Sequence, residues 1–209
     1  MKNLVIIGAG GLGRTVLGIA QESLGFGSEF RIKGFIDDNL QALEGYPNYP
    51  AILGTIAAYI PQPDDVFVCS IGGVSRRKCI ESLLGKGAEF INLIHESARI
   101  RTNVKLGKGN VIFPFVSIGA DSVLGDYNTI QSFTTIGHDV TIGDYNRIDT
   151  HVTCVGGVRI GNEVDIYTSG VINLGVEVED GAHVGACSFV IRKVKAGTTV
   201  FGVPAKKLD

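Results

Sequence analysis

An unbroken six-residue repeat of apolar side chains runs through residues 100–190 of this chain. Sixteen consecutive repeat positions hold an aliphatic residue or cysteine. In a chain that is 44% hydrophobic, chance filling of one fixed register has odds on the order of 10⁻⁶. A six-residue period is typical of a β-solenoid, in which each flat side buries one side chain and then turns a corner. The repeat positions are Ile100, Leu106, Ile112, Ile118, Leu124, Ile130, Ile136, Ile142, Ile148, Cys154, Ile160, Ile166, Ile172, Val178, Val184 and Val190.

Three six-residue sides make a triangular coil of 18 residues, so residues 18 apart are expected to lie above one another. We therefore predict a parallel β-helix domain over residues 95–209, with five coils between 100 and 190. Glycine is abundant, at 29 residues, and often follows a repeat position directly. We expect these glycines to allow tight or left-handed backbone at the corners.

Residues 1–94 do not follow the repeat and alternate between strand and helix signals. Strands are expected at 4–7, 31–36, 51–53, 66–71 and 89–94. Helices are expected after Gly13, between Thr55 and Pro61, and from Ser75 to residue 84. This alternation predicts a small parallel α/β domain of Rossmann-like type, so the chain is expected to have two domains.

Composition narrows the class of protein. A net charge of −2 gives no reason to expect binding to nucleic acid or to a membrane surface. No apolar run is long enough for a transmembrane helix and no signal peptide is evident, so a cytoplasmic location is expected. The cysteines form no CxxC pair, and we expect neither a metal site nor disulfides. Cys154 occupies a repeat position and is expected to be a buried core residue.

The 18-residue register singles out one histidine. His138 is predicted to lie between Ala120 and Gly156, and such small neighbours leave room for a ligand. Asp139 could hold one imidazole nitrogen, so that the other nitrogen acts as a base. The alternative is a surface histidine at a corner with no chemical role.

Two other histidines carry less weight. His183 shares a register position with Arg147 and Asp165, which is most simply a structural stack of charges. His151 lies shortly before Cys154, the cysteine of the repeat.

A second candidate site lies in the first domain. Residues 8–13, GAGGLG, fit the GxGxxG pattern between a strand and a helix, where backbone N–H groups can face a phosphate. Asp37 ends the next strand, where an acid that binds ribose would lie, and Gly72 and Gly73 end a third strand at the same sheet edge. This pattern suits a dinucleotide or a nucleotide-sugar, and the alternative is that the glycines only form tight turns.

Motifs along nearly the whole chain resemble those of one enzyme family. The chain is similar to the bacterial sugar acetyltransferases of the sialic-acid O-acetyltransferase and bacillosamine or perosamine N-acetyltransferase type. The resemblance rests on IIGAGGLG (6–13), FIDDN (35–39), CSIGGVSRRK (69–78), FINLIHESARI (90–100), IGHDVTIGDY (136–145), CVGGVRIGN (154–162) and FGVPAKK (201–207), together with the repeat.

This resemblance implies a fold, an activity and a set of roles. It implies a left-handed β-helix, a homotrimer, acetyl-CoA as co-substrate without a metal, and acetylation of a nucleotide-activated sugar in bacterial surface-glycan biosynthesis. His138 would be the general base, Asp139 would raise its basicity, and the Gly156 N–H would contact the thioester carbonyl. The implied acetyl-CoA contacts are Arg147, Gly156, Thr168, Ala186 and Pro204, and the implied sugar-nucleotide contacts are Gly10, Gly11, Leu12, Asp37, Asp38, Gly72 and Gly73.

Three residues depart from the family pattern. Leu12 stands where the glycine loop usually has histidine, Arg147 stands in place of a second histidine, and Gln131 replaces a common asparagine. These departures leave the sugar and the attacking group, amine or hydroxyl, open. Two other readings also stay open: a trimer that binds a nucleotide-sugar without catalysis, and a dinucleotide-dependent oxidoreductase, although no hydride-transfer site is evident.

Overall fold

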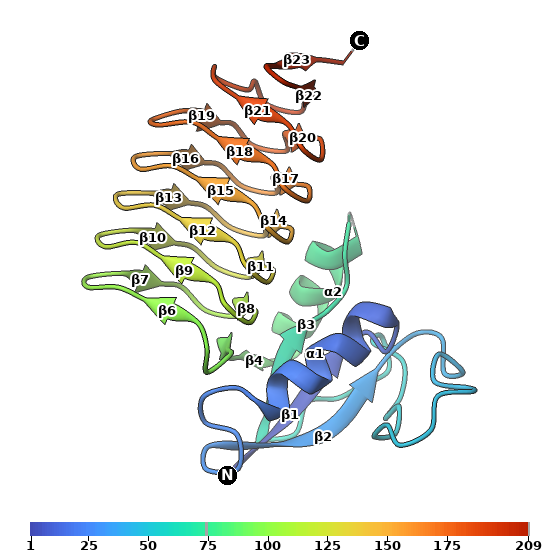
Figure 1. Ribbon diagram of the computed structural model, residues 1–209. Coiled ribbons are helices and arrows are strands. Elements are labelled where there is room, and N and C mark those ends of the chain that lie inside the picture. Colours follow the sequence, from blue (N-terminus) through green and yellow to red (C-terminus); the bar gives the residue numbers. More distant parts are fainter. Residues whose placement is uncertain (74, 209) are drawn as a thin grey trace. The chain divides into compact units, whose positions relative to one another are not determined.

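The computed structural model describes residues 1–73 and 75–208, and its contacts divide the chain into two compact units (Figure 1). The first unit is Met1–Glu96 and the second is Ser97–Asp209. The boundary falls two residues after the position expected from the sequence. Residue 74, inside the 69–78 motif, and residue 209 lie outside the described residues.

The first unit is a parallel sheet with the strand order β2-β1-β3-β4. Apolar residues fill β1 and β3 because both faces of these strands are covered, and Val5, Ile6 and Phe67 are fully buried. Helix α1 packs through an apolar stripe that includes Val16 and Ala20. The elements are β1 (Lys2–Ile7), α1 (Gly11–Gln21), β2 (Phe30–Ile36), β3 (Asp65–Cys69), α2 (Ser75–Leu84), β4 (Glu89–Phe90) and β5 (Leu93–Ile94).

Three sequence predictions in this unit differ from the structure. Residues 51–53 form no strand, because only Ile52 makes an isolated bridge, to Phe35 of β2. The helix expected from Thr55 to Pro61 is a single turn, in which the Thr55 side chain accepts the Ala58 N–H at 3.2 Å. A segment this short lacks the hydrogen bonds that offset helix nucleation. The strand expected over 89–94 is interrupted and forms β4 and β5.

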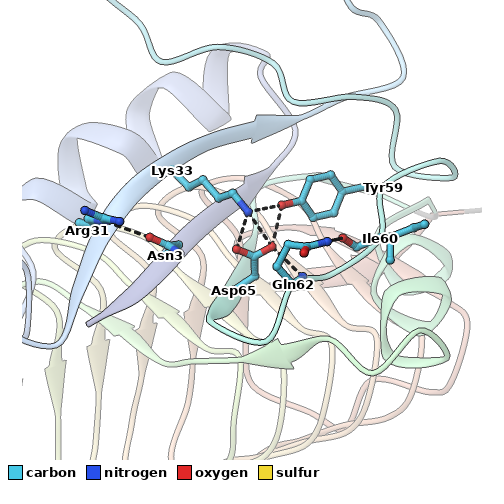
Figure 2. A network of polar contacts seen from close by, with 7 residues as sticks. All are labelled: Asn3, Arg31, Lys33, Tyr59, Ile60, Gln62 and Asp65. Carbon is cyan, nitrogen blue, oxygen red and sulfur yellow. Dashed lines mark hydrogen bonds and ion pairs between the residues drawn. The ribbon is translucent and has the colours of Figure 1, made fainter.

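A buried carboxylate joins β2, β3 and the segment between them (Figure 2). The Asp65 side chain has no exposed surface and accepts hydrogen bonds from Lys33 Nζ at 2.7 Å and from the Tyr59 hydroxyl at 2.7 Å. The Gln62 N–H adds a third, at 2.9 Å. Burial alone would raise the pKa of Asp65, but these hydrogen bonds together outweigh it and hold the pKa below its ordinary value.

We expect Asp65→Asn to lower the free energy of unfolding by about 2 kcal/mol at pH 7, because it leaves Lys33 without its charge partner. A depressed carboxyl pKa stabilises the fold above about pH 4 and loses this effect as the pH falls through the folded-state value. The difference between variant and parent should therefore shrink between pH 7 and pH 3. Urea denaturation at both pH values measures it.

Glu89→Gln is the matched control, because it breaks the exposed Lys2–Glu89 pair and should cost less than about 0.5 kcal/mol. An Asp65 variant as stable as this control would show that the network contributes nothing to folding.

The second unit confirms the six-residue repeat throughout (Figure 1). Each repeat position is the second residue of a two-residue strand, and each strand pairs in parallel with the strand 18 residues away, as Ile136 does with Cys154. The strands are β6 (Arg99–Ile100), β7 (Lys105–Leu106), β8 (Val111–Ile112), β9 (Ser117–Ile118), β10 (Val123–Leu124), β11 (Thr129–Ile130), β12 (Thr135–Ile136), β13 (Thr141–Ile142), β14 (Arg147–Ile148), β15 (Thr153–Cys154), β16 (Arg159–Ile160), β17 (Asp165–Ile166), β18 (Val171–Ile172), β19 (Glu177–Val178), β20 (His183–Val184) and β21 (Phe189–Val190).

The repeat side chains fill the interior of the coil. From Ile112 onward every repeat position is buried, whereas Ile100 and Leu106 in the first coil are more exposed. Cys154 is fully buried as expected, and burial raises the pKa of its thiol to about 12. A hairpin of β22 (Thr199–Gly202) and β23 (Ala205–Lys207) follows the last coil.

The glycines after repeat positions have a different role from the one expected. Left-handed backbone falls instead on the residue three places after the repeat position, which is often not glycine, as at Phe133 and Asp139. A Cβ on Gly119 would lie 2.5 Å from the carbonyl carbon of Gly137 in the adjacent coil. Glycine is therefore needed here because stacked backbones approach closely, not because of its φ angle.

Along one corner, side-chain oxygens accept hydrogen bonds from backbone N–H groups of the adjacent coil. Asp126 Oδ1 accepts the Lys108 N–H at 2.8 Å, and Asp144 Oδ1 accepts the Asp126 N–H at 2.7 Å. Asn162 and Asp180 continue the ladder with the same 18-residue offset. Corner N–H groups that no strand can pair are thereby satisfied.

Candidate active site

His138 and Asp139 form a close pair at a corner of the β-helix. The imidazole Nδ1 lies 2.6 Å from Asp139 Oδ2, as the sequence analysis expected of a carboxylate that holds one ring nitrogen. A carboxylate at this distance favours the tautomer that is protonated on Nδ1, in which the Nε2 lone pair can accept a proton. Both side chains are about two-thirds exposed, so solutes can reach Nε2.

Gly156 provides the space in which the imidazole lies. A Cβ on Gly156 would be 2.7 Å from both Cε1 and Nε2 of His138, so any larger residue would displace the ring. Its N–H donates no hydrogen bond to any residue that the structure describes. The corner therefore presents a basic nitrogen and a free N–H donor close together, an arrangement suited to removing a proton beside a developing oxyanion.

Arg147 lies on another side of the β-helix and is held by a carboxylate that the sequence analysis missed. Its guanidinium makes two bonds to Asp149, Nε to Oδ1 at 2.7 Å and Nη2 to Oδ2 at 2.9 Å. Gln131 Nε2 also donates to Asp149 Oδ1, at 2.8 Å. The bond to Asp149 raises the pKa of the guanidinium further.

The predicted charge stack of Arg147, Asp165 and His183 is only partly correct. The three residues share one register. The paired carboxylate of Arg147, however, is Asp149, while Asp165 lies 3.3 Å from His183 Nδ1. Asp149 and Gln131 are 18 residues apart, so the coil register was a signal that could have revealed their contact.

The remaining predicted acetyl-CoA contacts follow strands of a different side from His138. His138 and Gly156 follow β12 and β15, whereas Thr168 and Ala186 follow β17 and β20. Pro204 lies in the turn between β22 and β23 and is exposed. One chain therefore places His138 and Gly156 together and Thr168 and Ala186 at another corner, about one side of the triangle away.

The glycine segments of the first unit meet at the carboxyl edge of its sheet. Gly8 follows β1, Asp37 follows β2, and Ser70 follows β3, with β1 paired to both neighbours. The Ser70 hydroxyl donates to the carbonyls of Ile7 at 2.6 Å and Gly8 at 3.0 Å, which fixes the two loops together. Helix α1 begins after Gly10 with no side-chain cap, so its first N–H groups are available to an anion.

Both aspartates expected to bind the sugar nucleotide accept hydrogen bonds from backbone N–H groups. Asp37 Oδ2 accepts the Ala9 N–H at 2.7 Å, which closes the glycine loop onto β2. Asp38 Oδ1 accepts the Ile56 N–H at 3.0 Å. Gly11 and Leu12 form the first turn of α1, and Gly72 and Gly73 lie just before α2.

The sequence did not predict that a cation lies beside the glycine loop of residues 8–13. The Arg14 guanidinium lies 3.7 Å from the centre of the Tyr46 ring, a cation–π contact beside the glycine loop. No spacing rule predicts it, because Tyr46 belongs to an irregular segment.

Within residues 1–73 and 75–208, no group of three histidine, cysteine, aspartate or glutamate side chains is placed to hold a metal ion. Over the same residues, no helix has the length and apolar character needed to cross a membrane.

Comparison with known proteins supports both halves of this description. The PglD N-terminal domain model matches residues 3–83, and the bacterial transferase hexapeptide model matches residues 103–138. A UDP-N-acetylbacillosamine N-acetyltransferase of Bacillus subtilis (strain 168) is 33% identical over 117 residues, 54% of this chain. The chain spans about half (51%) of the length of that relative.

Solved structures match over the full chain. The acetyltransferase domain of PglB from Neisseria gonorrhoeae FA1090 has a TM-score of 0.90 at 28% identity, covering 100% of both chains. That domain has also been solved in complex with acetyl coenzyme A. PerB from Caulobacter crescentus, in complex with CoA and GDP-perosamine, has a TM-score of 0.89 at 25% identity, covering 100% of this chain and 98% of its own.

The second unit is thus a left-handed parallel β-helix of hexapeptide repeats, and the first is a Rossmann-like domain of the PglD type. The same fold is found in solved sugar acetyltransferases built on hexapeptide repeats. In sequence, the chain is similar to the Bacillus subtilis UDP-N-acetylbacillosamine N-acetyltransferase and to the PglB acetyltransferase domain.

Proposed function

We propose that this protein transfers the acetyl group of acetyl-CoA to an amino group of a nucleotide-linked sugar, with His138 as the general base. The observation that carries the proposal is the His138 corner, where a carboxylate-held imidazole lies beside the free N–H of Gly156. The relatives named for their substrates act on amino sugars, which favours an amine over a hydroxyl as the attacking group.

The proposed chemistry needs no covalent enzyme intermediate. The sugar amine attacks the thioester carbon while His138 Nε2 takes its proton. The negative charge that develops on the carbonyl oxygen is stabilised by the Gly156 N–H, an effect worth about 3 kcal/mol in comparable sites. Collapse of the tetrahedral intermediate expels CoA thiolate, which receives a proton, and releases the acetamido sugar.

The positions of the predicted acetyl-CoA contacts support a homotrimer. Thr168 and Ala186 lie at a different corner from His138, so a second copy must supply them if they contact the same acetyl-CoA as His138. The flat sides of a triangular β-helix suit such packing. The glycine edge of the first unit, with Asp37 and the start of α1, would hold the nucleotide, in the cytoplasmic location expected from the sequence.

Release of CoA thiol from acetyl-CoA tests the proposed function. The panel would pair UDP- and GDP-linked amino sugars with the matching hydroxy sugars, with a correction for the four free thiols of the protein. We expect release with at least one amino sugar and none with its hydroxy counterpart. Binding of a nucleotide-sugar without release by any acceptor would favour the non-catalytic binding protein instead.

A further inference from the structure

The first coil of the β-helix, which contains β6 and β7, carries a local excess of positive charge (Figure 1). Between Glu96 and Asp121 the chain has no acidic residue and four basic ones, Arg99, Arg101, Lys105 and Lys108. All four are exposed. The net charge of −2, which gave no reason to expect a membrane partner, therefore hides a strong separation of charge along the chain.

Three of these cations have no partner among the residues that the structure describes. The side chains of Arg101, Lys105 and Lys108 form no hydrogen bond or ion pair there. The first two carboxylates of the second coil are already engaged. Asp121 accepts a hydrogen bond from an asparagine side chain of the first coil at 2.9 Å, and Asp126 accepts the backbone N–H of Lys108 at 2.8 Å. The three cations are therefore available to an external anionic partner.

The same end of the β-helix exposes side chains of its apolar interior. Ile100 is 37% exposed and Leu106 is half-buried, whereas their equivalents in the second coil, Ile118 and Leu124, are 0% and 1% exposed. Within the described residues, β6 and β7 are the outermost strands of their sheets. A solenoid end of this kind requires a cover or a polar cap. The first coil thus combines exposed apolar side chains with a ring of cations.

This combination suits the surface of an anionic lipid bilayer. Lipid headgroups offer phosphates to the cations, and the boundary with the acyl chains accepts apolar side chains. A nucleic acid would also offer phosphates, but residues 97–112 contain no aromatic ring on which a base could stack. The cytoplasmic leaflet of a membrane is the anionic one, which agrees with the cytoplasmic location expected from the sequence.

We propose that this end of the β-helix docks the protein on the anionic surface of a lipid bilayer, through Ile100, Arg101, Lys105, Leu106 and Lys108. The inference goes beyond the proposed acetyl transfer and does not depend on it. A trimer whose three-fold axis runs along the β-helix would present three such ends to the same side, so that their attractions add within one assembly. Cations beside free strand edges can also keep copies of a chain apart, and the experiment separates this role from docking.

Co-sedimentation of the full-length protein with lipid vesicles tests this docking. We expect binding to vesicles of phosphatidylcholine with phosphatidylglycerol, no binding to phosphatidylcholine alone, and loss of binding as the salt concentration rises. A triple variant, Arg101→Gln with Lys105→Gln and Lys108→Gln, should lower the partition coefficient roughly 100-fold, because each cation near an anionic surface contributes a factor of about five. Its thermal unfolding should match that of the parent, since these side chains are exposed.

The matched control combines Arg31→Gln, Lys78→Gln and Arg159→Gln. It removes the same amount of positive charge from exposed positions outside the first coil. This control should bind anionic vesicles as the parent does. An equal loss of binding in both triple variants would reduce the effect to net charge and overturn the proposal.

Failure of the parent to sediment with anionic vesicles would overturn the proposal as well. If the first triple variant then self-associates in sedimentation velocity while the parent does not, the cations serve only to keep copies apart. Tighter binding of the parent to duplex DNA than to anionic vesicles, lost in the same variant, would replace the bilayer with a nucleic acid. Acetyl transfer is measured with soluble substrates, so each of these outcomes leaves the proposed function standing.

Discussion

His138→Asn is expected to lower kcat/KM for acetyl transfer by about 10³-fold, the usual range for loss of a positioned general base. Asparagine cannot accept the proton of the attacking amine, whereas binding of acetyl-CoA and of the sugar nucleotide should persist. Because His138 is exposed and its ring supports no core packing, the free energy of unfolding should change by less than about 0.5 kcal/mol. Steady-state kinetics and urea denaturation measure the two effects.

The matched control is His151→Asn on the same β-helix. His151 is also exposed, but its ring stacks on Phe133 at 5.0 Å, and no carboxylate among residues 1–73 and 75–208 pairs with it. This variant should retain full activity. If both variants lose activity equally, or if His138→Asn unfolds the protein, His138 is a structural corner residue and the proposed mechanism fails.

Gly156→Ala is expected to lower kcat by about 100-fold, because the new methyl group would occupy the place of the His138 ring. The atoms that the methyl would meet belong to the end of an exposed side chain, which can rotate away. The fold should therefore survive with a cost of about 1 kcal/mol, while the base is displaced by roughly 1 Å or more, enough for a loss of this size. Kinetics and thermal unfolding of the variant test both expectations.

A double-mutant cycle makes this prediction specific. In the His138→Asn background, Gly156→Ala should reduce the residual rate much less than it does in the parent, because its main target is already gone. Gly18→Ala is the control, since nothing lies within 4 Å of its added Cβ. Fully additive losses at positions 138 and 156 would mean that Gly156 acts independently of the imidazole.

The fold of the second unit could be predicted almost completely from the repeat. One buried side chain per six residues leaves no other register, and the pairing of Ile136 with Cys154 follows from it directly. The reason for the glycines could not be predicted in the same way. A left-handed φ angle at a corner and a short distance between coils both favour glycine, and the sequence does not distinguish them. In the structure, Gly119 is required by the short distance between coils, whereas the left-handed φ falls on Asp139.

In the first unit, predictions failed where contacts from distant residues decide the local structure. Thr55 and Pro61 are residues that commonly start and stop a helix. The segment between them instead contains Tyr59, whose hydroxyl donates a hydrogen bond to Asp65 of β3. The attachment of Ile52 to β2 is likewise a single bridge without a continuing ladder. Local propensity contains no information on such partners.

At the candidate site, the sequence predicted which residues meet at the His138 corner, but not every hydrogen-bond partner of the other site residues. Stacking of Gly156 on His138 and the bond from Asp139 were expected, and both contacts are present. The bond from Arg147 to the buried Asp149 was not predicted. The family motifs single out position 147 but not the carboxylate two residues later.

The corner ladder of Asp126, Asp144, Asn162 and Asp180 has a consequence for how such a chain can change. Each acceptor serves a backbone N–H 18 residues earlier, so an inserted or deleted residue would misalign every coil beyond it. A whole added coil would restore every bond with new partners. The smallest insertion in the gene that keeps every ladder hydrogen bond is thus a block of eighteen codons. Related proteins should therefore differ in length by whole coils.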